Sequence, residues 1–504
     1  MIMHRVCAVM ILVLILFAPA PSRQTAAMPG LEAGPVLPYR VAEPAGEIVA
    51  DLERFIPDYM SQKRIPGTSV ALIRDGKVVW TDGFGVTNTI TRRRVTPETL
   101  FEVASNSKVV TAYIALRLVD QGLLSLDEPL NSYLSEPWLP PSAYRDTITL
   151  RQVLSHTSGL GHLTKSRESR FPPGEGFFYS GIGFAYLRAV LEEVTGRPLE
   201  DLAQELVFAP LGMPDSSFTS SRPGIAPRTA SGHLHALAPT LMFLLPFFLV
   251  LFVIDLVALP INRLLTGHWR PGRRLIFGIL VAALLLSLAP SLLFFVESGM
   301  PAFGWLVVLW ALFLAAALAL AALAGRTLIS RLLPWRRVAG AVLMVGWCLL
   351  ALAGLLYLAA RIPNLPAPKW PQPQPDAGGS LRATTSDLAT FLIELSDPRY
   401  LSPETAAQMQ AYQAELAPDL SWGLGPGIQH SGQGDALWQW GQHLHFQSVM
   451  IIYPEQGFGV VVCTNNDLTR PEVASEIAHR ALGGKIEPIM QQATGLAYNY
   501  RPEE

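Results

Sequence analysis

The sequence predicts an α/β (α+β) domain that is interrupted by an inserted four-helix transmembrane bundle. Apolar residues concentrate in one internal block, residues 236–366, where 11 of 131 residues are charged, against 67 of 373 in the rest of the chain. The flanks instead mix strand-like and helix-like patterns, which are typical of a mixed domain. Together the flanks hold about 350 residues, roughly enough for one domain cut in two.

The N-terminus has the pattern of a secretory signal. A basic start precedes a 13-residue apolar run from Val6 to Ala18, whereas a membrane-spanning helix needs about 20 residues. Cleavage after Ala20 or Ala27 fits this pattern, but without a clean cleavage site an uncleaved anchor stays open. In either case we expect residues 1–27 to direct the export of the segment that follows.

Two strands and two helices are predicted before the apolar block. Thr68–Ile73 and Lys77–Thr81 are alternating, strand-like runs around Asp75-Gly76, a strong signal for a β-hairpin. Helical periodicity runs over Ser105–Gln121 and Gly183–Thr195, and a glycine directly after each run favours the end of the helix.

Four apolar runs inside the block are each long enough to cross a membrane as a helix. They contain 20 to 23 residues, sufficient for a hydrocarbon core of about 30 Å. The runs are Leu241–Pro260, Leu275–Val296, Ala302–Ala324 and Val338–Ala360. The connectors around Arg270 and Arg331 each carry four arginines, whereas the middle link carries Glu297 and no basic residue. The positive-inside rule therefore places both arginine connectors in the cytoplasm and both ends of the bundle outside, in agreement with an exported N-terminus.

A proline-rich linker follows the block and leads into further helix and strand signals. Thr384 and Asp387 resemble a capping box at the start of a helix. Ser448–Tyr453 and Phe458–Thr464 are strand-like runs joined by a short turn. The predicted organisation is a signal or anchor at 1–27, the first part of the domain at 40–235, the bundle at 236–366, the second part at 367–490 and a tail at 491–504.

The composition and the histidine pattern argue against a nucleic-acid-binding protein, a disulfide scaffold and a metal site. A formal net charge of −2 leaves no basic footprint for nucleic acid, and three scattered cysteines exclude a disulfide scaffold. The pairs His233/His235 and His443/His445 could each present two imidazoles from a strand, but no acidic or cysteine partner shows a ligand pattern. We therefore expect neither a metal nor another cofactor, and we expect His156 to make a structural hydrogen bond in its turn.

Ser105 and Lys108 form a candidate nucleophilic pair at the start of a predicted helix. A serine in the first turn and a lysine three residues later project from one face. The helix N-terminus favours developing negative charge, and a partly desolvated lysine can lose its proton and activate the hydroxyl. Taken alone the pair is weak evidence, because an ordinary capped helix can show the same spacing.

The surrounding motifs make the pair specific. Ser105-x-x-Lys108 is followed in order by Leu154–Leu160, Tyr179-Ser180-Gly181, Pro210–Met213, Ala377–Leu381, Ser386–Leu388 and Gln439-Trp440-Gly441. This series resembles the serine β-lactamase and penicillin-binding protein superfamily, most closely its class C β-lactamase and esterase-like branch. The resemblance covers most of both flanks and implies a central antiparallel sheet flanked by helices.

Roles follow from the resemblance position by position. Ser105 would be the acylated nucleophile, Lys108 its base or proton relay, and Tyr179 a proton shuttle toward the leaving group. The backbone N–H groups of Ser105 and Gln442 would form the oxyanion hole. The positions that would contact the substrate are Gly181, Gln439, Trp440 and Gly441.

Two of these positions depart from the family pattern. Gly181 stands where the second motif has an asparagine that holds the substrate. Gln439 stands where the third motif has lysine or histidine, so a neutral amide replaces a cationic or proton-donating group. The loss of one positioning group can raise a barrier by several kcal/mol. Recognition of the carboxylate of a classical lactam or D-Ala-D-Ala substrate is the property that these replacements put in doubt.

We interpret the chain as a membrane-tethered serine hydrolase that acts through an acyl-enzyme on an amide or ester. The expected substrate is a β-lactam, a cell-wall peptide, or a D-amino-acid peptide or ester, and the lipid bilayer is the other expected partner. The catalytic domain would face the periplasm or the cell exterior. The alternative is a non-catalytic sensor or pseudoenzyme, which Gly181 and Gln439 favour and the complete Ser105, Lys108 and Tyr179 set opposes. A transporter fits less well, because the four apolar runs contain almost no polar pathway.

Overall fold

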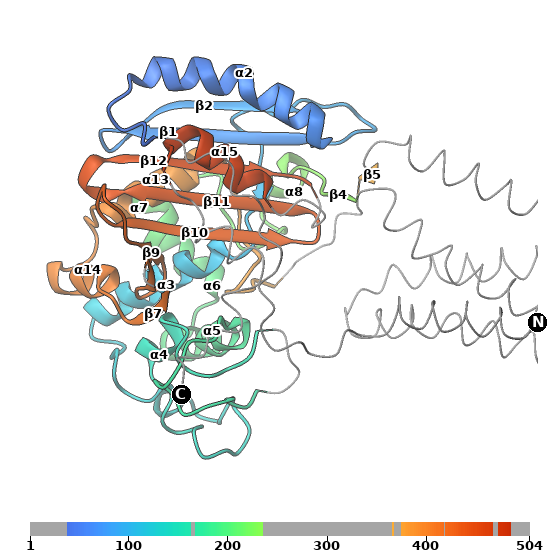
Figure 1. Ribbon diagram of the computed structural model, residues 1–504. Helices are drawn as coiled ribbons and strands as arrows, with labels where there is room; N and C mark the ends of the chain where they lie inside the picture. The colour runs from blue at the N-terminus through green and yellow to red at the C-terminus, as the bar shows by residue number, and fades with distance from the viewer. Residues whose placement is uncertain are drawn as a thin grey trace, which may run out of the picture.

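An eight-stranded antiparallel sheet forms the centre of the protein (Figure 1). The computed structural model describes residues 38–162, 167–234, 365–366, 374–417, 419–466 and 472–484. In spatial order the strands are β2 (Lys77–Gly85), β1 (Gly67–Arg74), β12 (Phe458–Thr464), β11 (Phe446–Tyr453), β10 (Ala436–His443), β9 (Gly427–Gln429), β8 (Leu420–Trp422) and β7 (Ala414–Ala417). The sheet confirms the antiparallel α/β architecture that the sequence predicts.

The two flanks of the apolar block join in this sheet. β1 comes from the first flank and pairs along its length with β12 from the second flank, from Thr68 opposite Thr464 to Ile73 opposite Gly459. A second junction pairs β3 (Phe101–Glu102) with β6 (Arg382–Ala383). Segments separated by more than 270 residues therefore lie side by side, and the second junction directly precedes Ser105.

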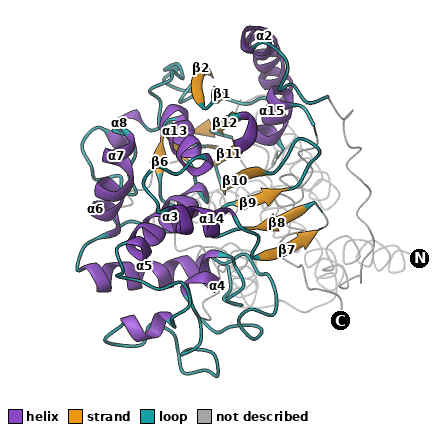
Figure 2. Cartoon of the chain, turned by 90° about the vertical axis from the view of Figure 1, so that its left-hand side faces the viewer, coloured by secondary structure: helices purple, strands orange, loops and turns teal. Residues whose placement is uncertain are grey.

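Helices cover both faces of the sheet (Figure 2). α2 (Ala45–Lys63) and α15 (Val473–Leu482) share one apolar core with one face, and α3 (Asn106–Asp120) and α13 (Thr385–Ser396) share another core with the opposite face. The remaining helical segments are η1 (Leu130–Tyr133), α4 (Leu150–Leu154), α5 (Gly181–Thr195), α6 (Leu199–Ala203), η2 (Gln204–Phe208), α7 (Ala209–Leu211), α8 (Ile225–Arg228), α14 (Pro403–Gln410) and η3 (Pro454–Gln456).

The predicted hairpin is confirmed, but one detail of it is wrong. β1 and β2 meet in a two-residue turn in which Asp75 has φ +51° and Gly76 has φ +65°, as a type I′ hairpin requires. The expected alternation fails in β1, where seven of eight residues are buried. Val70 faces the core of α2 and α15, whereas Ala71 faces the core of α3 and α13, so both faces of this strand must be apolar.

The other predicted elements form close to their expected bounds. α3 and α5 each end before a left-handed glycine, Gly122 and Gly196. β11 and β12 form around the predicted turn. Only half of the capping box at α13 is present: Thr384 Oγ1 accepts from the Asp387 N–H at 3.0 Å, while the Asp387 carboxylate accepts from Ser216 Oγ at 2.8 Å.

The block itself lies largely outside the described residues, and so do the four apolar runs, the N-terminal 1–27 segment and the 491–504 tail. In the part that the structure does describe, no helix combines the length and the apolar character needed to cross a bilayer. The strand just before the block and the last two residues of the block are described, however. β4 (His233–Leu234) pairs with β5 (Leu365–Pro366), so the chain leaves the domain and returns to it at adjacent positions.

Candidate active site

Ser105 occupies a sharp turn between β3 and α3. Ala104 in this turn adopts φ +47°, a left-handed conformation that costs a residue with a Cβ roughly 1–2 kcal/mol. Ser107 Oγ donates to Ala104 O at 2.5 Å, and the Val103 N–H donates to Leu381 O at 3.0 Å, which together hold the turn in place. The Ser105 side chain makes no helix-capping hydrogen bond, so its hydroxyl is left for chemistry.

Lys108 is buried beside this hydroxyl. Its Nζ donates to Ser105 Oγ at 3.0 Å and to Gly378 O at 2.8 Å, and the side chain is 2% exposed. Burial lowers the pKa of Lys108 to about 8, against the opposing effect of the Asp376 charge. A substantial fraction of the amine is therefore neutral near pH 8 and able to accept the proton of Ser105.

Tyr179 and Gln439 complete the group. The buried Tyr179 ring lies 4.9 Å from Lys108 Nζ, and its hydroxyl accepts a hydrogen bond from Gln439 Nε2 at 2.9 Å. The same amide nitrogen lies 3.3 Å from Ser105 O, to which it also donates. Gln439 thus acts as a neutral donor that connects Tyr179 to the Ser105 turn, and the structure brings all three predicted catalytic side chains together.

β10 approaches the Ser105 turn closely because residue 441 lacks a side chain. A Cβ at Gly441 would lie 2.0 Å from Val103 O and 2.5 Å from Ser448 Oγ. Ser448 Oγ donates to Val103 O at 2.9 Å and so ties β11 to the same turn. Gln442 directly follows Gly441, and its backbone therefore lies near Ser105, as an oxyanion hole built from these two N–H groups requires.

Trp440, predicted as a substrate contact, lies in the protein core. Its side chain is 6% exposed, and its ring packs 5.1 Å from the Tyr179 ring between centroids. The structure therefore gives Trp440 the role of supporting Tyr179.

Gly181, the first residue of α5, explains the departure in the second motif. A Cβ at this position would lie 2.4 Å from His162 O, a backbone atom that cannot move without shifting the chain. The space that an asparagine would fill is therefore occupied by backbone. Ser180 caps α5 by accepting from the Gly183 N–H at 2.8 Å, so the motif keeps its helix start while losing its amide.

Restoring the asparagine should therefore harm the protein. We expect Gly181→Asn and Gly181→Ala to lower the free energy of unfolding by about 1–3 kcal/mol through overpacking, measured as a lower Tm by circular dichroism. Gly46→Ala is the matched control, because it lies in the first turn of α2 and its Cβ would meet nothing within 4 Å. An unchanged Tm together with new penicillin labelling of Gly181→Asn would contradict this account.

Two of the histidines have structural roles. His156 is buried with φ +59°, and its Nδ1 accepts from the Ser180 N–H at 3.0 Å, which agrees with the predicted turn hydrogen bond. Burial lowers the pKa of His156 well below its usual value, so the ring is neutral. His233 Nε2 accepts from the Thr89 N–H at 3.2 Å and its Nδ1 lies 3.1 Å from Asn465 O, so both ring nitrogens are used. His235 lies outside the described residues.

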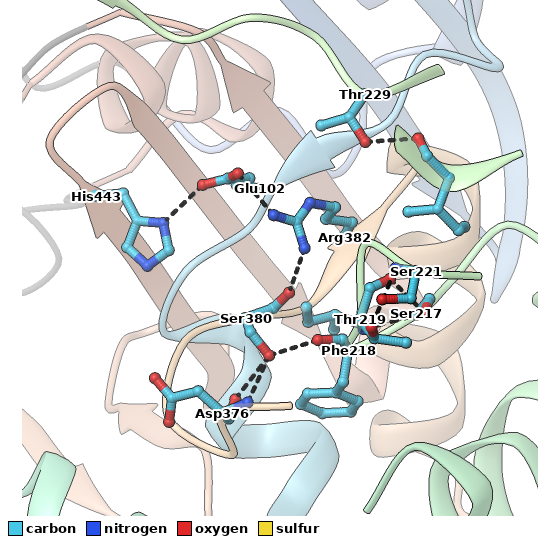
Figure 3. Close-up of polar contacts among 12 residues, drawn as sticks. Glu102, Ser217, Phe218, Thr219, Ser221, Thr229, Asp376, Ser380, Arg382 and His443 are labelled. Carbon is cyan, nitrogen blue, oxygen red and sulfur yellow. Dashed lines mark hydrogen bonds and ion pairs between the residues drawn. The ribbon is translucent and has the colours of Figure 1, made fainter. Parts of the chain in front are cut away.

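A charged network behind the Ser105 turn was missed by the sequence analysis (Figure 3). Glu102 Oε1 accepts from Arg382 Nη2 at 2.9 Å, and Glu102 Oε2 lies 3.2 Å from His443 Nδ1. Burial by itself would raise the pKa of Glu102, but the His443 hydrogen bond and the Arg382 charge hold it below its usual value. No local sequence pattern indicates this network, because the β3–β6 pairing brings together positions that are 280 residues apart in the sequence.

The turn that follows the proline-rich linker was also missed. Asp376 Oδ1 accepts from the Gly378 N–H at 2.9 Å, and the Asp376 N–H donates to Ser380 Oγ at 2.7 Å. Ser380 Oγ in turn donates to Phe218 O at 2.7 Å (Figure 3). These bonds fix the Gly378 carbonyl where Lys108 reaches it.

Comparison with known proteins places this geometry in a family. The sequence model described as beta-lactamase matches residues 52–248 and 351–485, more than half of the chain and all of the site residues above. The chain belongs to the β-lactamase family. The match leaves out residues 249–350.

Sequence relatives of this β-lactamase-family protein include two bacterial proteins. Esterase EstB from Burkholderia gladioli is 29% identical over 212 residues, which are 36% of this chain and 54% of the esterase. Protein flp from Staphylococcus aureus is 25% identical over 187 residues, which are 33% of this chain and 38% of that protein. The chain thus spans about half or less of the length of these relatives.

Solved structures share the fold over most of the chain. D-amino acid amidase from Ochrobactrum anthropi SV3 aligns with a TM-score of 0.54 and 16% identity, covering 88% of this chain and 99% of the amidase. The octameric penicillin-binding protein homologue from Pyrococcus abyssi aligns with a TM-score of 0.53 and 19% identity, covering 86% of this chain and 76% of that one. Identities this low establish a common fold and nothing finer.

Proposed function

We propose that this protein is a serine hydrolase that acts through an acyl-enzyme on an ester or amide. The observation that carries the proposal is the 3.0 Å hydrogen bond from the buried Lys108 Nζ to Ser105 Oγ. A serine hydroxyl is a weak nucleophile unless an adjacent base removes its proton, and a buried amine with a lowered pKa is such a base. The sequence similarity to an esterase supports an ester as the substrate.

The proposed reaction has two steps, acylation of Ser105 and hydrolysis of the acyl-enzyme, and the same residues act in both. Neutral Lys108 removes the proton from Ser105 Oγ as that oxygen bonds to the substrate carbonyl carbon. The resulting oxyanion accepts hydrogen bonds from the N–H groups of Ser105 and Gln442. Tyr179 relays the proton from Lys108 to the leaving group as its bond to the carbonyl carbon breaks. Water then attacks the acyl-enzyme in the same way, releasing the acid and regenerating Ser105.

Covalent labelling tests this function. A fluorophosphonate probe should label the wild-type protein but not Ser105→Ala. Ser132→Ala is the control and should label normally, because Ser132 is an exposed serine outside the motifs of the site. Labelling is read by gel fluorescence and the modified residue by mass spectrometry. Penicillin labelling tests the β-lactam subclass, with cell-wall peptides and D-amino-acid esters as the other candidates. Folded wild-type protein that reacts with neither reagent would refute the hydrolase.

The second candidate is a sensor that binds a ligand without turning it over. Gly181 and Gln439 favour it, because each replaces a group that holds the substrate in the family pattern. Stoichiometric binding without product release would support the sensor. Multiple turnovers that depend on Ser105 would exclude it.

We further propose that the block at 236–366 tethers the domain to a membrane, with the catalytic domain in the periplasm or cell exterior. Its four apolar runs and arginine-rich connectors support this arrangement. The family match omits residues 249–350, and β4, just before the block, pairs with β5 at its end, as expected for an insertion into a loop.

Reporter fusions test the topology. Alkaline phosphatase fused after Arg270 should be inactive because that connector is cytoplasmic, whereas fusions after residue 235 and after Asp376 should be active outside. A green fluorescent protein series should give the complementary pattern. Activity after Arg270 with none after Asp376 would reverse the scheme.

A further inference from the structure

The Asp376–Gly379 turn is surrounded by three ionisable side chains. A Cβ at Gly378 would lie 3.5 Å from both Lys108 Nζ and Asp376 Oδ1. A Cβ at Gly379 would lie 3.4 Å from Asp376 Oδ2 and 3.2 Å from His443 Nε2. The base of the proposed reaction, a carboxylate and an imidazole nitrogen therefore border one stretch of backbone, and Figure 3 shows Asp376 and His443 near this turn.

Asp376 carries a negative charge that is uncompensated once Lys108 is neutral, the state in which Lys108 acts as the base. Its side chain is exposed, its Oδ1 accepts from the Gly378 backbone, and it forms no ion pair with any residue that the structure describes. Glu102 differs, because Arg382 and His443 occupy its two oxygens. The positive charge of Arg382 is therefore matched by Glu102, whereas the negative charge of Asp376 has, within the described part of the chain, only the Lys108 amine beside it.

In its neutral form, His443 adds a second acceptor beside Asp376. Its Nδ1 lies 3.2 Å from Glu102 Oε2, so a neutral imidazole carries its proton on Nδ1 and donates it to that carboxylate. Nε2, the nitrogen toward Gly379, is then a lone-pair acceptor. A carboxylate and an acceptor nitrogen suit an ammonium group, which only donates, and repel a carboxylate, which only accepts.

When Lys108 is neutral, as the proposed reaction requires, no unpaired cation among the described residues of the site offsets this arrangement. Gln439 is buried and neutral, and its amide nitrogen already donates to Tyr179 and to Ser105 O. Lys108 is committed to Ser105 Oγ and Gly378 O. A substrate carboxylate would therefore meet Asp376 without a fixed positive partner, whereas a substrate cation would meet a complementary charge.

We infer that the site selects substrates that carry a positive charge near the scissile carbonyl, and that Asp376 determines this selection. The inference rests on the proposed hydrolase and names its substrate class. Two opposite charges a few ångströms apart at a partly solvated site change binding by about tenfold after screening.

Two pairs of substrates with the same shape and different charge provide the test. On the acyl side, p-nitrophenyl esters of D- and L-alanine are compared with the isobutyrate ester, in which a methyl replaces the ammonium. On the leaving-group side, acetylthiocholine is compared with 3,3-dimethylbutyl thioacetate. The quantity measured is the ratio of kcat/KM for the charged and neutral members, so any general effect on Lys108 cancels.

We expect the wild-type ratio to favour the cation in at least one pair and to fall with added salt. Asp376→Asn should lower that ratio about tenfold. Asp58→Asn is the control, because it removes the same charge from an exposed position on α2, on the opposite face of the sheet, and should leave the ratio unchanged. A ratio that Asp376→Asn leaves unchanged in both pairs, with the neutral ester still hydrolysed, would overturn the inference.

A binding measurement separates this inference from the proposed function. Choline and 3,3-dimethylbutan-1-ol have the same shape and need no turnover, so their affinities can be compared on Ser105→Ala protein by ligand-observed NMR. Tighter binding of choline that disappears in Ser105→Ala/Asp376→Asn would support the selection even if wild-type protein hydrolyses nothing. Equal affinities would count against it, whatever the labelling experiment shows.

Discussion

Lys108→Met should lower kcat/KM for p-nitrophenyl acetate by about 10³-fold. Methionine keeps the buried, unbranched shape but removes the amine that lies 3.0 Å from Ser105 Oγ, and general bases contribute about 10²- to 10⁴-fold. In wild-type protein, kcat/KM should rise with pH and level off above about 8, because only neutral Lys108 can take the proton. Measuring kcat/KM across pH for wild-type protein and for Lys108→Met tests both the loss of activity and the pH profile.

Lys108 should also make the free energy of unfolding depend on pH. Because burial lowers the pKa of Lys108 to about 8, its charge destabilises the folded state fully below pH 8. The penalty shrinks as pH rises toward the unfolded value of 10.5, where both states are neutral. Wild-type protein should therefore gain up to about 3 kcal/mol relative to Lys108→Met between pH 8 and 10.5, measured by urea denaturation.

Lys77→Met is the control for both measurements. Lys77 is exposed at the start of β2, so its removal should change neither the activity nor the pH dependence of stability. A Lys108→Met protein that keeps wild-type kcat/KM would exclude Lys108 as the base. A stability difference that is flat between pH 8 and 10.5 would show that the amine is not buried as described.

Gly441→Ala should reduce kcat by about 10²-fold or more. The new Cβ would lie 2.0 Å from Val103 O, so β10 would have to move away from the Ser105 turn. That movement would displace the Gln442 N–H from the Ser105 N–H, and the loss of one oxyanion donor costs about 10²- to 10³-fold in kcat. KM should change less than kcat, because the oxyanion forms only in the transition state.

Gly432→Ala is the matched substitution for that experiment. Gly432 lies in the turn before β10, and a Cβ there would meet nothing within 4 Å, so its kcat and Tm should stay at wild-type values. Gly441→Ala should also unfold at a lower temperature, because overpacking is destabilising. Normal kcat in Gly441→Ala would mean that the oxyanion hole lies elsewhere.

The elements with local signals were predictable and those that depend on pairing were not. The β1–β2 turn follows from Asp75-Gly76, and the end of α3 follows from Gly122, because each conformation is written in adjacent residues. The alternation expected in β1 failed because both faces are covered by helices from distant parts of the chain. The residues around β1 do not indicate that helices pack on its second face.

The same division applies to the site. Ser105, Lys108 and Tyr179 are carried by motifs, and the structure brings them together. Asp376 and the link between Glu102 and His443 carry no motif, because their positions result from the packing of loops and from the β3–β6 pair. In the sequence, Gly181 looks like the loss of a substrate-binding asparagine. In the structure, the His162 carbonyl occupies the space that a side chain at this position would need.

The pairing of β4 with β5 has a thermodynamic consequence for the block between them. With Leu234 opposite Leu365, the intervening 130 residues close as one loop whose two ends are neighbours in a ladder. Loop-closure entropy grows only with the logarithm of length, so this loop costs about 3 kcal/mol more than a four-residue turn. That penalty falls further when the inserted residues assemble so that their own ends meet. The catalytic domain can therefore accept a long, chemically different segment at a cost of only a few kcal/mol to the pairing of its two halves.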